Sequence, residues 1–446
     1  MKAFQHKSNL KHTAVLLFGI MMSCATVKAQ DIPCLPSSFG ETESQSAWCG
    51  IVAYTLHITA HGESTSEGGW YLIASPIGSV VATDVVNLVA STTPEDPTNF
   101  DLYRFNEAAE LEWENWKQQN SDHYHFNLEP GRGYLYANAA DVNLVFAGTP
   151  YSGNGEVTIT NVAGHPLSGW NLVGNPFSVD AYIGRDFYVL NEARSEVMPE
   201  ASTGAIPSME GVFVLAEQDE ETVTFSTEAL NKGRASKPEQ VVLNLSRDRG
   251  LVIDRAIVRM GEGRTLPKFQ LNRNSTKLYI PQDGTDYAIA CAESTGEMPV
   301  NFKAETNGTY TISVDVDNVE MGYLHLIDNM TGADVDLLAA NGGDARPCVS
   351  TYTFTAKTTD YESRFKLVFA VGSSTGSDTF AFFSNGNIIV NGTGTLQVID
   401  MTGRVLYTAE ANSAFRIPHS AFPTPGVYVL RLINGDNVRT QKIVVE

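Results

Sequence analysis

Two segments of this chain share one nine-residue pattern, and this repeat constrains the fold more than any other feature. Residues 69–77 have the sequence Gly-Trp-Tyr-Leu-Ile-Ala-Ser-Pro-Ile, and residues 169–177 have Gly-Trp-Asn-Leu-Val-Gly-Asn-Pro-Phe. An internal repeat of this kind indicates a structural unit that occurs twice. The proline predicts the end of a strand, because proline donates no hydrogen bond to a neighbouring strand.

Three further landmarks follow in the same order in both copies: a turn containing Asn-Glu-Ala, a strand after a glycine, and a closing strand. They lie at 101–108, 133–137 and 143–146, and again at 186–193, 211–216 and 222–225. We therefore expect two β units, at residues 68–149 and 150–227. Trp70 and Trp170 are expected in their cores, because tryptophan is usually deeply buried. Glu107 and Glu192 recur in the equivalent turns, which favours a structural role over catalysis.

An insertion at residues 110–125 makes the first copy longer. Leu111 and Trp113 alternate as in a strand, whereas Trp113 and Trp116 have helical spacing, and we adopt the strand. Exposed aromatic side chains on a β scaffold can stack on sugars or anchor a protein partner. Core packing is the more frequent alternative. The candidate ligand contacts are Trp113, Trp116, Tyr124, Tyr134 and Tyr136.

The start of the chain has the features of a secretory signal peptide. Lysines precede an apolar run at 14–22, which is too short to span a membrane, and Val-Lys-Ala precedes Gln30. We assign residues 1–29 to this peptide and 30–67 to a short segment that leads into the first β unit. Cys24 offers a rival interpretation as a lipoprotein cysteine, but the preceding Met-Met-Ser fits that motif poorly.

Charge and cysteine content narrow the partners and the compartment. The chain has 51 acidic and 30 basic residues, a net charge of −21, which argues against nucleic acid and anionic membranes as partners. An even number of cysteines after the leader suggests two disulfides in an exported protein. Proximity favours Cys34–Cys49 and Cys291–Cys348 among the three pairings of Cys34, Cys49, Cys291 and Cys348.

The second half of the chain also has strand patterns. Residues 228–240 are polar and contain helix and strand breakers, so we expect a linker. Short alternating strands at 241–371 predict an antiparallel β-sandwich. A Gly/Ser/Thr-rich linker at 372–379 and a compact set of strands at 380–446 follow. The whole chain is therefore predicted to be all-β.

The last hairpin is predicted from its turn. Asn-Gly pairs at 385–386 and 434–435 predict type I′ turns. The second pair would join strands 427–432 and 438–445. We expect Val427, Val429 and Leu432 to form the buried row of this hairpin.

No motif points to catalysis, a metal or a cofactor. Residues 372–376 match Gly-x-Ser-x-Gly, but a nucleophile elbow requires a strand before and a helix after, and here a linker and a strand follow. His123 and His125 have no identifiable further ligands. Asp315 and Asp317 resemble the start of a calcium loop that lacks its glycine and distal glutamate. We therefore expect a protein that is not an enzyme.

The terminal segment resembles the type A sorting domain of the type IX secretion system. The matching residues are Ile-Asp-Met-Thr-Gly-Arg-Val-Leu at 399–406, Pro-Gly-Val-Tyr-Val at 425–429, and a late lysine before Val-Val. The middle of the chain is similar to non-catalytic modules of Bacteroidetes cell-surface proteins, on the Gly-Trp segments and on 323–328 and 364–369. The candidate sorting residues are Gly403, Gly426, Tyr428 and Lys442.

The resemblance implies a small C-terminal Ig-like β-sandwich, Sec export, folding in the periplasm and passage to the outer cell surface by the type IX machinery. It also implies removal of the domain and attachment to surface lipopolysaccharide. Many relatives carry a protease or adhesin domain upstream, whereas residues 30–67 are too short for an enzyme domain. We expect a non-enzymatic binding or adhesion protein with a glycan or host-protein ligand. A structural spacer or assembly component is the alternative, and a hydrolase hidden in the duplicated region ranks last.

Overall fold

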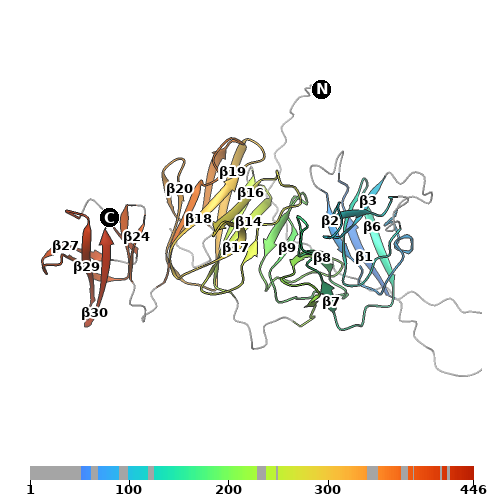
Figure 1. The fold of residues 1–446 in the computed structure, drawn as a ribbon, viewed down its shortest axis with the longest axis horizontal. Coiled ribbons are helices and arrows are strands. Elements are labelled where there is room, and N and C mark those ends of the chain that lie inside the picture. Colours follow the sequence, from blue (N-terminus) through green and yellow to red (C-terminus); the bar gives the residue numbers. More distant parts are fainter. Residues whose placement is uncertain are drawn as a thin grey trace, which may run out of the picture.

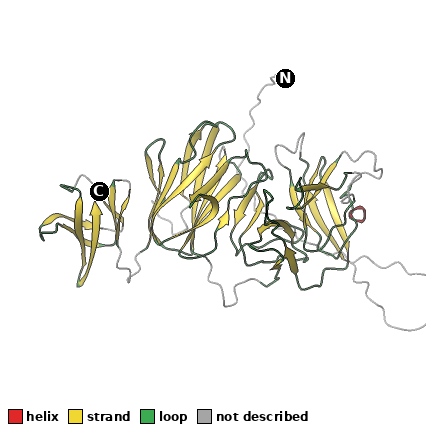
Figure 2. Ribbon diagram, viewed as in Figure 1, coloured by secondary structure: helices red, strands yellow, loops and turns green. Residues whose placement is uncertain are grey.

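The protein consists of β units that follow one another along its long axis (Figure 1). The computed structural model describes residues 52–61, 69–89, 99–118, 125–228, 238–247, 250–338, 350–372, 380–384, 386–411, 414–418 and 422–445. Within these ranges the elements are strands and one 3-10 turn, η2 (Ala82–Asp84), with no α-helix (Figure 2). The all-β prediction is therefore confirmed. The predicted signal peptide lies outside the described residues, as do Cys34, Cys49, His123, Tyr124 and Cys348.

The two copies have the same topology of six strands, which confirms the internal repeat. In each copy the first and last strands form a two-stranded sheet, and the middle four pair in the order β4-β3-β5-β2 or β10-β9-β11-β8. The insertion contributes β4, as the strand interpretation predicts. The strands are β1 (Val52–Ile58), β2 (Tyr71–Ala74), β3 (Phe100–Phe105), β4 (Trp113–Asn115), β5 (Gly133–Asn138), β6 (Val142–Gly148), β7 (Glu156–Ile159), β8 (Trp170–Gly174), β9 (Phe187–Leu190), β10 (Val197–Glu200), β11 (Gly211–Leu215) and β12 (Glu221–Thr224).

The two copies are in direct backbone contact. Gly174 N donates to Gly131 O at 2.9 Å, and Ala74 N donates to Met209 O at 2.9 Å. A Cβ atom on Gly174 would lie only 2.5 Å from the Cβ of Ala74. The strands can approach this closely because position 174 has no side chain.

A sheet of eleven strands forms the sandwich that follows. Its order is β21-β20-β23-β18-β16-β17-β14-β13-β19-β22, with β15 paired to β17. The pairs are antiparallel, as predicted, except that β14 and β17 are parallel. The strands are β13 (Gln240–Arg247), β14 (Val252–Met260), β15 (Leu266–Pro267), β16 (Lys277–Gln282), β17 (Thr285–Ala292), β18 (Thr295–Lys303), β19 (Gly308–Asp317), β20 (Met321–Asp328), β21 (Ala333–Asp336), β22 (Ser350–Ala356) and β23 (Phe365–Val371).

One hydrophobic cluster contains residues from both copies and from the sandwich, in addition to the separate clusters of the second copy and the sandwich. The ring of Trp170 stacks on that of Phe269 from the sandwich, with centroids 4.2 Å apart. The Tyr188 hydroxyl accepts a hydrogen bond from Phe269 N at 2.9 Å. A buried ion pair joins Asp186 of the second copy to Arg259 of the sandwich at 2.9 Å. These contacts join the second copy to the sandwich, which the predicted linker at 228–240 connects in the sequence.

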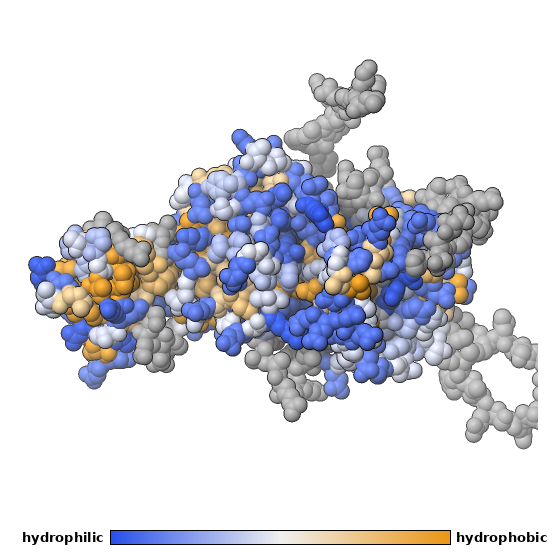
Figure 3. Space-filling view, in the orientation of Figure 1, coloured by the Kyte–Doolittle hydropathy of each residue, from blue (hydrophilic) through white to orange (hydrophobic). Residues whose placement is uncertain are grey.

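The C-terminal domain is a two-sheet sandwich at one end of the molecule. Its sheets are β24-β25-β28 and β27-β26-β29-β30, which enclose one hydrophobic core. Figure 3 shows hydrophobic residues gathered on its surface. The strands are β24 (Ala381–Ser384), β25 (Asn387–Asn391), β26 (Gly394–Ile399), β27 (Val405–Ala411), β28 (Ala414–Pro418), β29 (Gly426–Asn434) and β30 (Asn437–Val445).

The last hairpin differs from its prediction in turn and in buried row. Asn434 pairs with Asn437, so the turn is Gly435–Asp436, one residue later than expected. Glycine suits this turn because φ at Gly435 is +57°. The prediction that Val427 and Val429 form the buried row is wrong, since both are half-buried and face outward. Leu432 is buried as predicted, and the core is otherwise lined by Tyr428 and Leu430, which bury more apolar area than valine.

Candidate functional site

Three of the predicted ligand-contact aromatics are not available to a ligand. Trp116 is 6% exposed, and Tyr134 and Tyr136 are fully buried, so this prediction is wrong for them. Each ring keeps a partner for its polar atom: Trp116 Nε1 donates to Phe126 O at 3.1 Å, and the Tyr136 hydroxyl donates to Leu88 O at 3.0 Å. Burial is therefore compatible with their chemistry, and core packing is the correct alternative.

Trp113 and Trp70 lie half-buried at the edge of the core that the two copies share with the sandwich. The ring of Trp113 packs against Phe213 of the second copy, with centroids 6.0 Å apart. Trp70 and Trp170 are both expected in the core: Trp170 is buried at 7% exposure, whereas Trp70 packs against the core and is only half-buried. Trp113 serves in the contact between the two copies.

The recurring glutamates connect neighbouring units. The Glu107 carboxylate of the first copy accepts hydrogen bonds from the backbone N–H groups of Val162 and Gly169 in the second. Glu192 of the second copy accepts from Val252 N of the sandwich at 2.8 Å, and its own N–H donates to Val252 O. The same turn thus joins each copy to the unit that follows.

The other residues considered for metal binding, Asp315 and His125, make contacts that serve the fold. Asn244 donates to Asp315 at 2.8 Å; burial raises the pKa of Asp315, and the charge of Asp317 raises it further. His125 is stacked on Trp116, and burial lowers its pKa. The described residues contain no group of three or more His, Cys, Asp or Glu that could hold a metal ion.

Among the described residues Cys291 has no disulfide partner, and burial raises the pKa of its thiol. Its predicted partner, Cys348, lies outside the described residues, as do Cys34 and Cys49. Both disulfides stay predictions. Along the part of the chain that is described, no helix is long and apolar enough to cross a membrane.

Asp400 organises the turn between β26 and β27 in the C-terminal domain. Its carboxylate accepts hydrogen bonds from the hydroxyl and N–H of Thr402, at 2.6 and 2.9 Å, and from Arg404 N at 3.0 Å. These bonds, led by that of the Thr402 hydroxyl, lower the pKa of Asp400 to about 2. Gly403 completes the turn with φ of +85°. Gly403, one of the predicted sorting residues, therefore determines the backbone conformation of this turn.

The other candidate sorting residues lie in the final hairpin. Tyr428 is 4% exposed, and its hydroxyl donates to Thr424 O. Gly426 begins β29 opposite Val445. Lys442 is exposed on β30. Tyr428 therefore supports the core of the hairpin, whereas Lys442 is accessible to a partner.

The C-terminal domain is docked on the sandwich through its three-stranded sheet. Tyr323 and Ile327 of β20 and Val368 and Ala370 of β23 form a buried cluster with Ile389 of β25. The outer face of a sandwich is usually solvated, so apolar residues there mark a contact. The predicted linker therefore joins two domains that touch.

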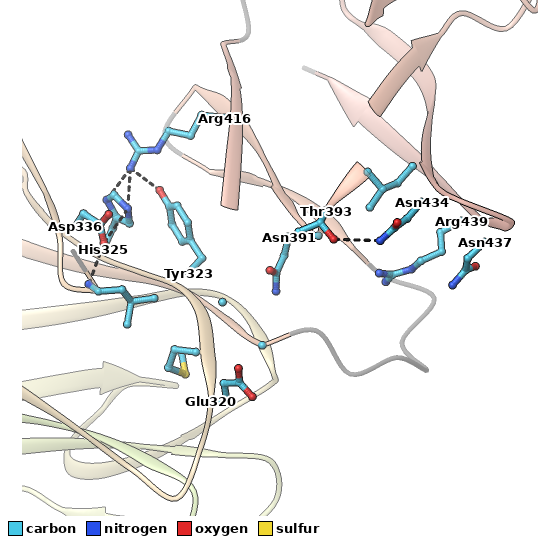
Figure 4. A pocket seen from close by; sticks show the side chains of 16 residues that line it. Glu320, Tyr323, His325, Asp336, Asn391, Thr393, Arg416, Asn434, Asn437 and Arg439 are labelled. Carbon is cyan, nitrogen blue, oxygen red and sulfur yellow. Dashed lines mark hydrogen bonds and ion pairs between the residues drawn. The ribbon is translucent and has the colours of Figure 1, made fainter. Parts of the chain in front are cut away.

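Arg416 of β28 is the main polar contact of this dock (Figure 4). Its guanidinium binds the Tyr323 hydroxyl and lies 3.0 Å from Asp334 Oδ1 and 2.7 Å from His325 Nδ1. Burial lowers the pKa of His325; Asp334 opposes this shift and Arg416 adds to it. The sequence does carry a signal for this contact, because Tyr323, Leu324, Leu326 and Ile327 are apolar on both faces of one strand.

A cleft of about 670 Å³ lies beside the dock. Its lining includes Glu320 and Asp336 from the sandwich and Asn391 and Arg439 from the C-terminal domain (Figure 4). Asn391 Nδ2 donates across the junction to Val371 O at 3.0 Å. The cleft is thus a product of the docked arrangement.

Comparison with known families identifies the C-terminal domain. Residues 379–446 match the family model described as the secretion system C-terminal sorting domain. This sorting domain belongs to type IX secretion, so its presence implies interaction with the type IX machinery and export to the cell exterior. No curated protein matches the chain.

Proposed function

We propose that this chain is a non-enzymatic binding or adhesion protein of the outer cell surface in the Bacteroidetes. The sorting domain at residues 379–446 is the observation that carries the proposal. Sec export, folding in the periplasm and attachment to surface lipopolysaccharide complete the route. The remainder supports a non-enzymatic role, because its buried charges bind one another, within the sandwich at Asp254–Lys268 and across a unit boundary at Asp186–Arg259.

A structural spacer is the second candidate, and one observation favours it. The duplicated unit, the sandwich and the sorting domain follow one another along the longest axis (Figure 1). Buried contacts stiffen the junctions, as at Trp170–Phe269 and at Arg416. Such a body would hold an attached group at a fixed distance from the cell.

Deleting residues 379–446 tests the export route. We expect a folded protein that stays in the periplasm, because the sorting domain has its own core. Cell fractionation and protease accessibility on whole cells measure the location. Fusing the same segment to an unrelated exported domain should send that domain to the surface. Surface display of the truncated chain would contradict the proposal.

Ligand binding distinguishes adhesion from spacing. The chain without residues 379–446 is applied to glycan arrays and host-matrix proteins. Saturable binding to one of them supports adhesion. Absence of binding would favour the spacer. The spacer would be supported further if an unrelated rigid β domain in place of residues 52–372 still held an attached group at the cell surface.

A further inference from the structure

We propose that the type IX machinery binds an aliphatic patch on the outer face of the four-stranded sheet of the sorting domain. This outer aliphatic patch consists of five residues from four strands: Ile399, Val405, Val427, Val429 and Val444. The proposal rests on the sorting function proposed above and specifies the surface that performs it.

Strand pairing places the patch residues side by side. Ile399 of β26 pairs with Val405 of β27 and with Val429 of β29, and Val427 pairs with Val444 of β30. Adjacent residues of a strand point to opposite faces. Because Tyr428, Leu430, Ile443 and Val445 point into the core, the patch residues point outward.

The two sides of the patch are exposed in the whole chain, and Ile399, Val427 and Val429 between them are half-buried. Val444 is 56% exposed and Val405 is 46% exposed. A contiguous apolar surface on an exported protein indicates an interaction site.

The dock leaves this face free for a partner. The outer face of the other sheet is covered by the sandwich, where Ile389 is 2% exposed. A receptor that meets the full-length chain therefore finds the four-stranded sheet as the broad open face of the sorting domain.

The charges around the patch indicate the chemistry of the partner. Lys442 pairs with Val429, and Arg431 lies further along β29; both are exposed. These cations stand out on a chain with a net charge of −21. Interfaces commonly combine an apolar centre with a charged rim. The fitting partner is thus a component of the secretion machinery with an aliphatic surface bordered by carboxylates.

Glutamate substitutions in the full chain test the patch. Val444→Glu and Val405→Glu place a charge at its two sides, on different strands. Val438→Glu is the matched control, because Val438 lies on the same strand and face as Val444, is 45% exposed and lies outside the patch. We expect about tenfold less surface-exposed protein for both patch variants, since a buried unpaired charge disrupts an interface. The control should match the parent.

Each outcome decides the proposal. Melting temperatures of the purified chains establish that the variants are folded. Two patch positions are substituted so that the test still holds if one of the variants fails to fold. Normal export of both patch variants would overturn the proposal. An equal loss of surface-exposed protein with Val438→Glu would also overturn it. If the deletion of residues 379–446 is also exported, the sorting function itself fails. Dimerisation of the parent that Val444→Glu abolishes would assign the patch to a second copy and overturn the proposal.

Discussion

At the scale of single residues, the two equivalent tryptophans have different surroundings. Trp170 is 7% exposed and stacks on Phe269, which comes from the sandwich. Trp70 is half-buried, with its ring edge-on to Tyr103 at 6.2 Å. The sequence repeat thus sets the strand position of each ring, whereas the neighbouring unit sets its burial.

The two rings should therefore contribute unequally to stability. We expect Trp170→Ala to lower the free energy of unfolding by about 3–5 kcal/mol, because it leaves a large cavity. Trp70→Ala should cost about 1–2 kcal/mol, because part of its ring is already in water. Urea denaturation of the full chain measures both changes. Equal losses would show that the neighbouring unit has no part in burying Trp170.

At the scale of elements, the contact between the copies depends on strands that carry glycine. A Cβ on Gly133 would lie 2.8 Å from Val173 O, and one on Gly174 would lie 2.6 Å from Arg132 O. Backbone atoms cannot move aside as a flexible side chain can. The two four-stranded sheets can therefore join only while these positions stay free of side chains.

Adding one methyl group at this contact should separate the strands. Gly174→Ala is expected to destabilise the chain by about 1–3 kcal/mol through overpacking. Gly78→Ala is the control, since a Cβ there meets nothing within 4 Å, and it should change stability by less than about 0.5 kcal/mol. Thermal denaturation of both variants provides the comparison, and equal behaviour would argue against a tight contact at Gly174.

At the scale of the whole molecule, the duplicated region and the sandwich are one body. Their shared core includes Leu72 of the first copy, Phe213 of the second and Ile257 of the sandwich. The buried pair Asp186–Arg259 adds a polar link at 2.9 Å. The sorting domain has a separate core, so it is the part that can unfold independently.

Calorimetry should therefore resolve fewer unfolding transitions than the number of repeat units in the sequence suggests. We expect the chain that ends at residue 372 to unfold in one transition with equal calorimetric and van't Hoff enthalpies. Arg259→Met should destabilise that transition by about 3–5 kcal/mol, because it leaves Asp186 buried without its ion-pair partner. Separate transitions for the repeats and the sandwich in the parent would contradict the shared core.

The sequence predicts features that depend on local pattern and fails where distant segments meet. The Gly-Trp repeat predicts its strands because glycine permits the positive φ that precedes each strand, tryptophan favours a buried strand face and proline ends the strand. The buried row of β29 is missed because Val427 and Val429 alternate with Tyr428 and Leu430, so both faces are apolar. The apolar faces of β20 indicate a contact but not its partner, because Arg416 meets His325 across 91 residues of sequence. No local pattern contains that pairing.

The outer aliphatic patch also sets an order of events in the life of the protein. Its members come from four strands, and Val444 lies next to the last described residue of β30. The patch therefore does not exist on a chain whose last hairpin has not closed on the rest of the sheet. A partner that binds it would ignore unfolded molecules and accept only folded ones.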